Sequence, residues 1–328
     1  ARQDVRTLLA QFSRWGLLNG GSPKEDLGDE GEPPLQPIQV EKRLSETISG
    51  LPRVPFPLAG HWFAITFSDV EMAAEWKTLF NPPATDEPPD EVGTELAVLA
   101  QNAGEDRRFF CYEIGICSDG GLSRNQAVRF LISKLFEHRM AGLQHRLLFL
   151  AAEVAKEGQA VLLPAQSGSG KSTLSAALAA SGWTYLSDEL AVVDPETRCV
   201  EPFALPIGLK DKSMEALAPF IPDVANLKRH IRIDAIGVRY HRPAEVQPKG
   251  CLPIRALVYP QYSHDAATRL TELPPLDSLA VLAATGSSAR PLVASDVQTM
   301  LKMASRPSYA LEFSDLGQAV NLLNALAI

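Results

Sequence analysis

Apolar and polar positions repeat with different periods along the chain, and these periods predict its elements. Residues 1–20 carry apolar side chains at steps of three and four, which predicts an amphipathic helix. Residues 21–55 are polar and rich in Pro and Gly, with too little apolar surface to form a core. The first 55 residues are therefore expected to form a helix and a linker.

Short β-type runs dominate the next part of the chain. The runs "HWFAITFS", "ELAVLAQ" and "FFCYEIGIC" are separated by "NPPATDEPPDE" and "SDGG", which are typical of turns and loops. Apolar residues at helical spacing follow in residues 124–143. This pattern predicts a small α+β domain over residues 56–144, whose last helix leads into the second half of the chain.

Apolar strand-like runs alternate with helical runs over residues 145–328. Alternation of this kind predicts an α/β layer built on a parallel or mixed sheet. The predicted fold class is therefore α/β for this larger domain, preceded by the smaller α+β domain.

Composition and net charge exclude several classes of protein. The 328 residues are 45% hydrophobic and 21% charged, and no apolar run reaches the roughly 18 residues that span a bilayer, so no membrane segment is predicted. A net charge of −8 argues against nucleic-acid binding, because such binding needs a basic surface. The N-terminal residues lack a signal-like apolar core and the four cysteines form no CxxC pair, so a cytoplasmic location is expected.

The stretch "PAQSGSGKST", residues 164–173, lies between a strand-like run and a helix-forming run. Strand, Gly-rich loop and helix in this order form the context of a phosphate-binding loop, where backbone N–H groups and the helix dipole hold an anion. Lys171 would reach the terminal phosphates, and Ser172 would present its hydroxyl to Mg²⁺. The residues predicted to bind nucleotide here are Gln166, Ser167, Gly168, Ser169, Gly170, Lys171, Ser172 and Thr173.

One position departs from the pattern G-x-x-x-x-G-K-[ST], because Ala165 stands where the first Gly is expected. An alanine is tolerable if the chain enters the loop at negative φ, since a Cβ is penalised only in the left-handed region. The alternative interpretation of the stretch is a solvated Gly/Ser turn that carries a surface lysine.

Two carboxylates follow at a spacing that discriminates between nucleotide proteins. Asp188 and Glu189 end a second predicted strand, and Asp188 comes only 17 positions after Lys171, which leaves room for one helix and one strand. Beside a triphosphate, one carboxylate can help hold Mg²⁺ and the other can accept the proton of an attacking hydroxyl. The alternative is a solvated strand end.

The segments "LLPAQSGSGKSTLSAAL", "GWTYLSDELAVVD" and "PFALPIGLKDKS" resemble the HPr kinase-related kinases, relatives of the bacterial HPr serine kinase/phosphorylase. The resemblance extends over residues 145–328, including "LPIRALVYPQY" and "SYALEFSDLGQAVNLL". It implies the phosphate-loop core shared with phosphoenolpyruvate carboxykinase, use of ATP and Mg²⁺, and a serine hydroxyl as acceptor. By position it implies Asp188 as the base, Glu189 as a carboxylate on the metal side, and Lys210 near the phosphates.

The chain also differs from HPr kinases proper. It has Thr173 where they have an acidic residue, Asp-Glu where they have Asp-Asp, and Leu150 at the position of their histidine, the nearest histidine being His145. Phosphorylase activity and HPr as the acceptor are therefore not carried over. Residues 1–20 are similar to the last helix of PqqD-like proteins that bind leader peptides, although a plain docking helix is the simpler interpretation.

The sequence as a whole predicts a kinase that transfers the γ-phosphoryl group of ATP to a hydroxyl of a peptide or small protein. Its catalytic residues would be Lys171, Asp188 and Glu189, and its Mg²⁺ would be held near Ser172, Glu189 and Asp188, with the choice of base between the two carboxylates left open. Two alternatives are a nucleotide-gated switch without transfer and a small-molecule kinase. No membrane or nucleic-acid partner is expected, and a homo-oligomer remains open.

Overall fold

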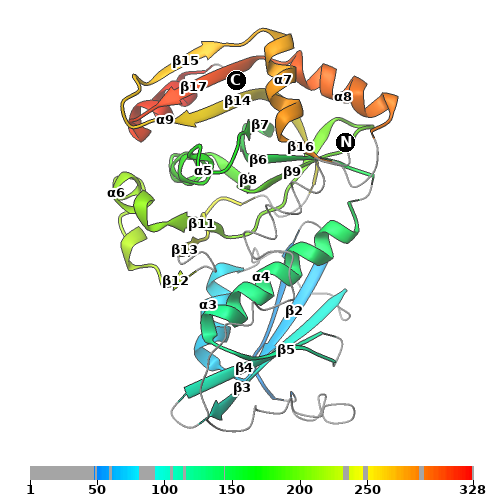
Figure 1. Cartoon of the computed structure of the whole chain (residues 1–328), viewed down its shortest axis with the longest axis vertical. Helices are drawn as coiled ribbons and strands as arrows, with labels where there is room; N and C mark the ends of the chain where they lie inside the picture. The colour runs from blue at the N-terminus through cyan, green and yellow to red at the C-terminus, as the bar shows by residue number, and fades with distance from the viewer. Residues whose placement is uncertain are drawn as a thin grey trace, which may run out of the picture.

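The computed structural model describes residues 48, 50–58, 61–80, 93–103, 106–113, 116–143, 145–231, 236–246, 250–287 and 292–326. The helix predicted for residues 1–20 and most of the predicted linker lie outside these residues. The described part of the chain is mixed α/β, with seven α-helices and three sheets (Figure 1). None of these helices is long and apolar enough to cross a membrane.

The N-terminal part contains a five-stranded sheet and two helices. The elements are β1 (Arg53–Leu58), β2 (His61–Phe67), α3 (Val70–Leu79), β3 (Thr94–Ala103), β4 (Asp106–Glu113), β5 (Ile116–Leu122) and α4 (Arg124–Ala141). The sheet has the order β1-β2-β3-β4-β5, in which only β2 and β3 pair in parallel. Alternate residues of β1 are buried, as a strand with one face on a core requires.

Two expectations for this region are wrong. The strand β1 begins at Arg53, so the predicted linker over residues 21–55 extends three residues too far. The sequence "SDGG" does not separate strands but lies inside β5, where the pairing with β4 shifts register and Gly121 has a φ of +69°. A glycine at positive φ is a common feature of a β-bulge, which explains why a turn signal occurs within a strand.

The helix α4 lies between the N-terminal sheet and the rest of the molecule (Figure 1). It begins with a capping box in which Ser123 and Gln126 each satisfy a backbone N–H. One hydrophobic cluster contains buried α4 residues such as Phe136, core residues of the N-terminal sheet, and Phe203 from the second half. The rings of Phe136 and Phe203 meet edge to face at 5.4 Å. The two halves of the chain therefore share a core across α4.

The second half is built on a nine-stranded mixed sheet. Its main order is β10-β9-β6-β7-β14-β17-β15, with β8 and β16 also paired to β6; only the β7–β14 and β14–β17 pairs are parallel. The strands are β6 (Leu147–Lys156), β7 (Gln159–Pro164), β8 (Thr184–Ser187), β9 (Leu190–Val193), β10 (Cys199–Glu201), β14 (Leu252–Tyr262), β15 (Arg269–Glu272), β16 (Gly286–Ser287) and β17 (Ser308–Phe313).

Four helices cover the two faces of this sheet. They are α5 (Lys171–Ala180), α7 (Pro275–Thr285), α8 (Ala294–Ala304) and α9 (Leu316–Ala325). Leu174 of α5 and Leu323 of α9 belong to one buried cluster, whereas Leu282 of α7 and Met303 of α8 belong to another. The sheet is therefore sandwiched between two helical layers, which agrees with the predicted α/β class.

Between β8 and β14 the expected alternation of strands and helices fails. This part of the chain forms β9, β10 and a separate three-stranded sheet of β11 (Ile207–Lys210), β13 (Gly237–His241) and β12 (Arg229–Ile231). The only α-helix within its described residues is α6 (Met214–Leu217), flanked by the 3-10 turns η1 (Asp211–Ser213) and η2 (Val224–Asn226). The small antiparallel sheet brings Lys210 near Lys171, at the loop between β7 and α5.

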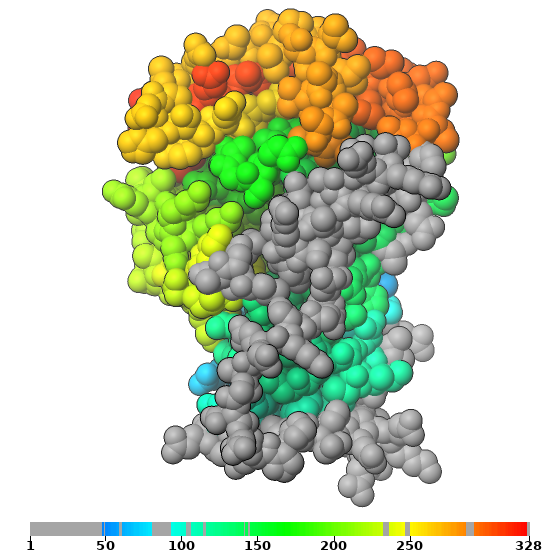
Figure 2. Space-filling view, in the orientation of Figure 1, coloured from blue at the N-terminus to red at the C-terminus, as the bar shows by residue number. Residues whose placement is uncertain are grey.

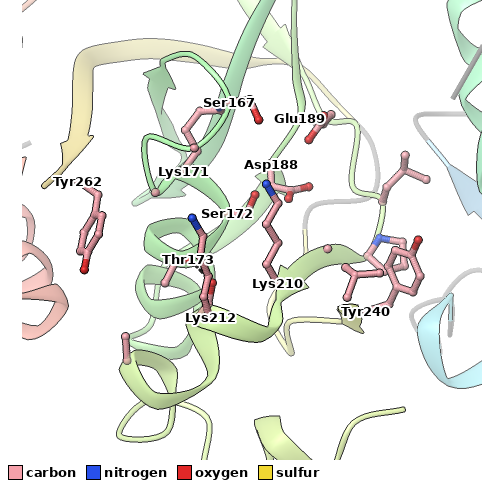
Figure 3. A pocket seen from close by; sticks show the side chains of 18 of the residues that line it. Ser167, Lys171, Ser172, Thr173, Asp188, Glu189, Lys210, Lys212, Tyr240 and Tyr262 are labelled. Atoms are coloured by element: carbon pink, nitrogen blue, oxygen red, sulfur yellow. Dashed lines mark hydrogen bonds between the residues drawn. The ribbon is translucent and has the colours of Figure 1, made fainter. Parts of the chain in front are cut away.

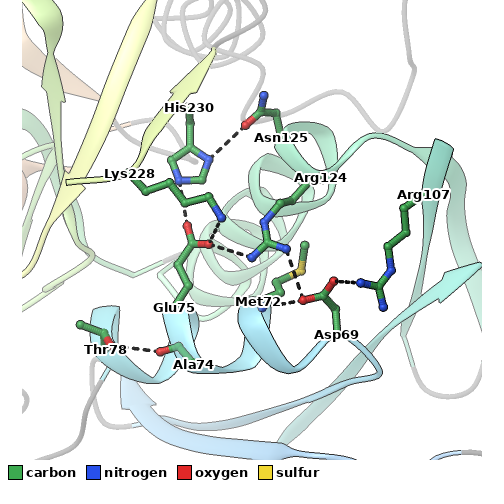
Figure 4. Close-up of polar contacts among 10 residues, drawn as sticks. All are labelled: Asp69, Met72, Ala74, Glu75, Thr78, Arg107, Arg124, Asn125, Lys228 and His230. Carbon is green, nitrogen blue, oxygen red and sulfur yellow. Dashed lines mark hydrogen bonds and ion pairs between the residues drawn. The ribbon is translucent and has the colours of Figure 1, made fainter. Parts of the chain in front are cut away.

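Basic residues on and beside β12 are paired within the protein. Glu75 of α3 contacts Lys228 Nζ at 2.9 Å, His230 Nε2 at 2.9 Å and Arg124 of α4 at 3.1 Å (Figure 4). Burial opposes the charge of Glu75, but the hydrogen bonds from these groups prevail and lower its pKa to about 2. An ionised Glu75 thus ties the N-terminal helices to the small sheet.

Candidate functional site

A cavity of about 360 Å³ lies where the parallel strands β7, β14 and β17 end. Ligands of open α/β sheets bind in this kind of crevice, outside the carboxyl ends of the strands. Most of the predicted phosphate-loop residues line the cavity, together with Tyr262 and Phe313 from the ends of β14 and β17. Residues of β11, β13 and α4 also line it. In Figure 2 the bright green region that includes the phosphate loop lies between the yellow and orange C-terminal layer and the yellow-green residues below it.

The local structure of the loop follows from its small residues. Gly168 and Gly170 have φ values of +91° and +93°, which only glycine adopts readily, whereas Ala165 is not among the described residues with positive φ. The loop therefore accommodates Ala165 in place of the expected glycine, because its backbone does not enter the left-handed region there. Helix α5 begins at Lys171 with Gly170 as its N-cap, and no side chain caps it. The N–H groups of its first turn, which have no intrahelical partners, remain available to an anion.

The two loop glycines allow a matched stability test. A Cβ on Gly168 would meet nothing within 4 Å, but one on Gly170 would lie 2.9 Å from the ring of Phe313 and 3.3 Å from Cβ of Tyr262. We expect Gly168→Ala to lower the free energy of unfolding by about 1–2 kcal/mol through backbone strain alone. Gly170→Ala should cost more, because the buried Phe313 ring must also move. Urea denaturation measures both, and equal losses in the two variants would contradict this account.

Lys171 folds back onto its own loop. Its Nζ donates to Ala165 O at 2.7 Å and to Gln166 O at 3.0 Å, and the residue is buried. Burial lowers the pKa of this ammonium group, and the charges of Glu189 and Asp188 oppose the shift. Lys171 is thus a buried cation near two carboxylates, at a helix N-terminus that no side chain caps. Such a cation is suited to bind an anion, and it would then give up its hydrogen bonds to the two carbonyl oxygens.

Asp188 is buried at the end of β8 and is held by two hydroxyl groups. The Tyr185 hydroxyl lies 3.0 Å from Asp188 Oδ1 and 2.9 Å from Leu205 O, and the Ser172 hydroxyl donates to the same carboxyl group. Burial raises the pKa of Asp188 to about 6, although the bonds from Ser172 and Tyr185 and the charge of Lys171 act in the opposite direction. A carboxyl group with a pKa near neutrality is suited to exchange a proton.

Most of the residues predicted from the sequence meet at this cavity. The predicted residues that line it are Ser167, Gly168, Gly170, Lys171, Ser172, Thr173, Asp188, Glu189 and Lys210 (Figure 3). Thr173 is partly committed, because its hydroxyl donates to the Ser213 hydroxyl at 3.0 Å. The described residues contain no cluster of three or more His, Cys, Asp or Glu that could hold a metal ion.

Two predicted loop residues do not line the cavity. The exposed side chain of Gln166 donates to Ala284 O at 3.2 Å. The backbone N–H of Ser169 donates to Gln166 O at 3.3 Å, so this N–H is engaged in a turn of the loop. The position at which HPr kinases carry a histidine, Leu150, does line the cavity, whereas His145 is exposed and does not.

Several cavity residues were missed from the sequence. They are Tyr185 behind Asp188, together with Arg129, Phe136, Lys212, Tyr240, Tyr262 and Phe313 on the cavity wall. A signal existed only for Tyr185, which precedes Asp188 by three residues in the same strand segment. The others come from α4, from the turn η1 and from distant strands, whose approach to the loop depends on the tertiary fold.

The chain matches no protein-family model, and a search of curated proteins gives no significant match. The function of the protein is therefore inferred from the residues of its cavity.

Proposed function

We propose that this protein is an ATP- and Mg²⁺-dependent kinase with a phosphate-loop core of the HPr kinase type. It transfers the γ-phosphoryl group to a hydroxyl, preferentially a serine of a peptide or small protein. One observation carries the proposal: an uncapped helix N-terminus, the buried Lys171 and the buried Asp188 border the same cavity.

The donor side of the reaction follows from the loop. The N–H groups of the first turn of α5 bind the phosphates, and Lys171 leaves Ala165 O and Gln166 O to neutralise charge at the γ-phosphoryl group. Oxygen ligands are those Mg²⁺ prefers, so the hydroxyl of Ser172 and the carboxylates of Asp188 and Glu189 fit this ion. When bound, Mg²⁺ would neutralise charge on the β- and γ-phosphate oxygens.

The acceptor side centres on Asp188. The carboxylate orients the acceptor hydroxyl and takes its proton, while the bond between the γ-phosphorus and the bridging oxygen breaks and a new phosphorus–oxygen bond forms. Ile132 and Phe136 of α4 line the cavity together with Asp188. This space supports a second substrate beside the nucleotide and favours transfer over hydrolysis alone.

The α4 residues in the cavity wall are also compatible with a second function. Because α4 is part of the core shared by the two halves, a nucleotide in the cavity would contact both halves and could act as a switch without transfer. Incubation with γ-labelled ATP, Mg²⁺ and candidate acceptors separates the possibilities. Label on a serine-containing peptide or small protein supports the proposal, label on a small molecule supports a small-molecule kinase, and binding or hydrolysis alone supports the switch.

A further inference from the structure

The cavity has two ends, and each carries a tyrosine. Tyr262 and Tyr240 lie on opposite sides of the group formed by Lys171, Ser172 and Asp188 (Figure 3). The Tyr240 end borders α4, whereas the Tyr262 end is formed where β14 and β17 finish. A ligand held at its middle by the phosphate loop would therefore direct one part toward each end.

The Tyr262 end is rigidly connected to the phosphate loop. The backbone N–H of Tyr262 donates to Ser169 O at 3.0 Å, and the backbone N–H of Ser263 donates to Phe313 O at 3.0 Å. The Phe313 ring is buried and meets the Tyr262 ring at 5.7 Å and 69°, edge to face. Tyr262 itself is 47% exposed. A large aromatic ring is thus fixed beside the loop while about half of it stays open to a ligand.

We propose that Tyr262, supported by Phe313, is the stacking platform for the nucleobase of the bound nucleoside triphosphate. The inference rests on the proposed function, because it requires the phosphates to occupy the loop. An exposed aromatic ring on the cavity wall gives a base a flat apolar surface, and ring stacking is a common way to bind nucleobases. With the base at this end, the γ-phosphoryl group faces Asp188 and the acceptor enters from the Tyr240 end.

The Ser314 hydroxyl at the Tyr262 end, which could recognise the edge of a base, is already engaged in a hydrogen bond. The Ser314 hydroxyl, which also lines the cavity, donates to Ala266 O at 2.8 Å. Stacking tolerates any base because every base has a π-face. We therefore expect GTP to bind within about fivefold of ATP, and a preference above about 100-fold would overturn a platform that acts by stacking alone.

Calorimetric titration of the full chain with ATP·Mg²⁺ and with inorganic tripolyphosphate·Mg²⁺ tests the platform. Tyr262→Ala should weaken ATP binding by about 5- to 150-fold, the usual effect of losing one stacked ring, and change tripolyphosphate binding by less than about twofold. Tyr262→Phe keeps the ring and should retain the affinity for ATP. Tyr262→Leu, which keeps apolar bulk without a ring, should resemble Tyr262→Ala.

Two results would overturn the platform. An equal loss of ATP and tripolyphosphate binding in Tyr262→Ala would mean that the residue acts through the loop, by its contact with Ser169. Unchanged ATP binding in both Tyr262→Ala and Tyr262→Leu would place the base elsewhere. Failure of the unmodified protein to bind ATP·Mg²⁺ would overturn the proposed function as well, so the two failures are distinguishable. Circular dichroism establishes that each variant is folded.

Discussion

Replacing Lys171 with Ala is expected to reduce phosphoryl transfer by at least about 10²-fold, the scale seen when one preorganised charge-stabilising donor is removed. Lys171 is the buried cation at the start of α5, and the negative charges of Glu189 and Asp188 stabilise its charged form. Without this cation the negative charge that develops on the transferring group would be left to backbone N–H groups. Transfer of label from γ-labelled ATP measures the rate, and calorimetry measures the affinity for ATP·Mg²⁺.

Two further variants control this prediction. Lys171→Met keeps most of the side-chain length and packing, so a loss shared with Lys171→Ala is due to the missing charge. Lys156→Ala removes a lysine whose ammonium lies over the Trp183 ring at 5.3 Å and which does not line the cavity. It should retain nucleotide binding and transfer. Unchanged affinity and turnover in both Lys171 variants would mean that the lysine does not serve a phosphate site.

Replacing Asp188 with Asn should leave ATP·Mg²⁺ binding largely intact and lower the transfer rate by about 10²–10⁴-fold, the usual contribution of a general base. The amide keeps the size of the carboxylate but cannot take the proton of an acceptor hydroxyl. Glu189→Gln is the matched comparison, since it makes the same chemical change at the neighbouring position. Its effect should appear mainly as a higher Mg²⁺ requirement.

The outcome also assigns the two carboxylates. If Glu189→Gln slows transfer at saturating Mg²⁺ while Asp188→Asn raises the Mg²⁺ requirement, the roles are exchanged. The pKa of about 6 to which burial raises the Asp188 carboxyl favours the first assignment. Normal binding and normal transfer in both variants would remove the chemical centre of the proposed reaction.

The pH dependence gives an independent check on Asp188. A base must be deprotonated to act, and burial raises the pKa of Asp188 to about 6. The value of kcat/KM, which reports the free enzyme, should therefore be constant above that pH and fall as the pH decreases through about 6. The fall belongs to Asp188 only if the residual activity of Asp188→Asn lacks it.

The strand, loop and helix around residues 164–173 were predictable because their determinants are local. Gly168 and Gly170 occupy positions with positive φ, and Lys171 follows them at the first position of α5. The position of Asp188 near the loop was predictable from its distance to Lys171 along the chain, because one helix and one strand return the chain to the loop. These features depend on backbone geometry within about 25 residues, and sequence spacing reports such geometry directly.

The rest of the cavity depends on contacts that spacing cannot report. Tyr262 and Phe313 reach the loop because β14 pairs in parallel with the loop strand β7, and β17 pairs in parallel with β14. Phe136 reaches it because α4 packs into a core shared by both halves. The basic residues Lys228 and His230, on and beside β12, are paired with Glu75 of the distant helix α3. Each of these outcomes is decided by tertiary packing.

A crystal structure of the protein with Mg²⁺ and a non-hydrolysable ATP analogue tests the central claim most directly. We expect the β- and γ-phosphates on the backbone N–H groups of Gly168, Gly170 and Lys171, the ammonium of Lys171 turned toward them, and Mg²⁺ within about 4 Å of the Ser172 hydroxyl. A triphosphate bound outside this cavity, or a metal held wholly by other residues, would contradict the account.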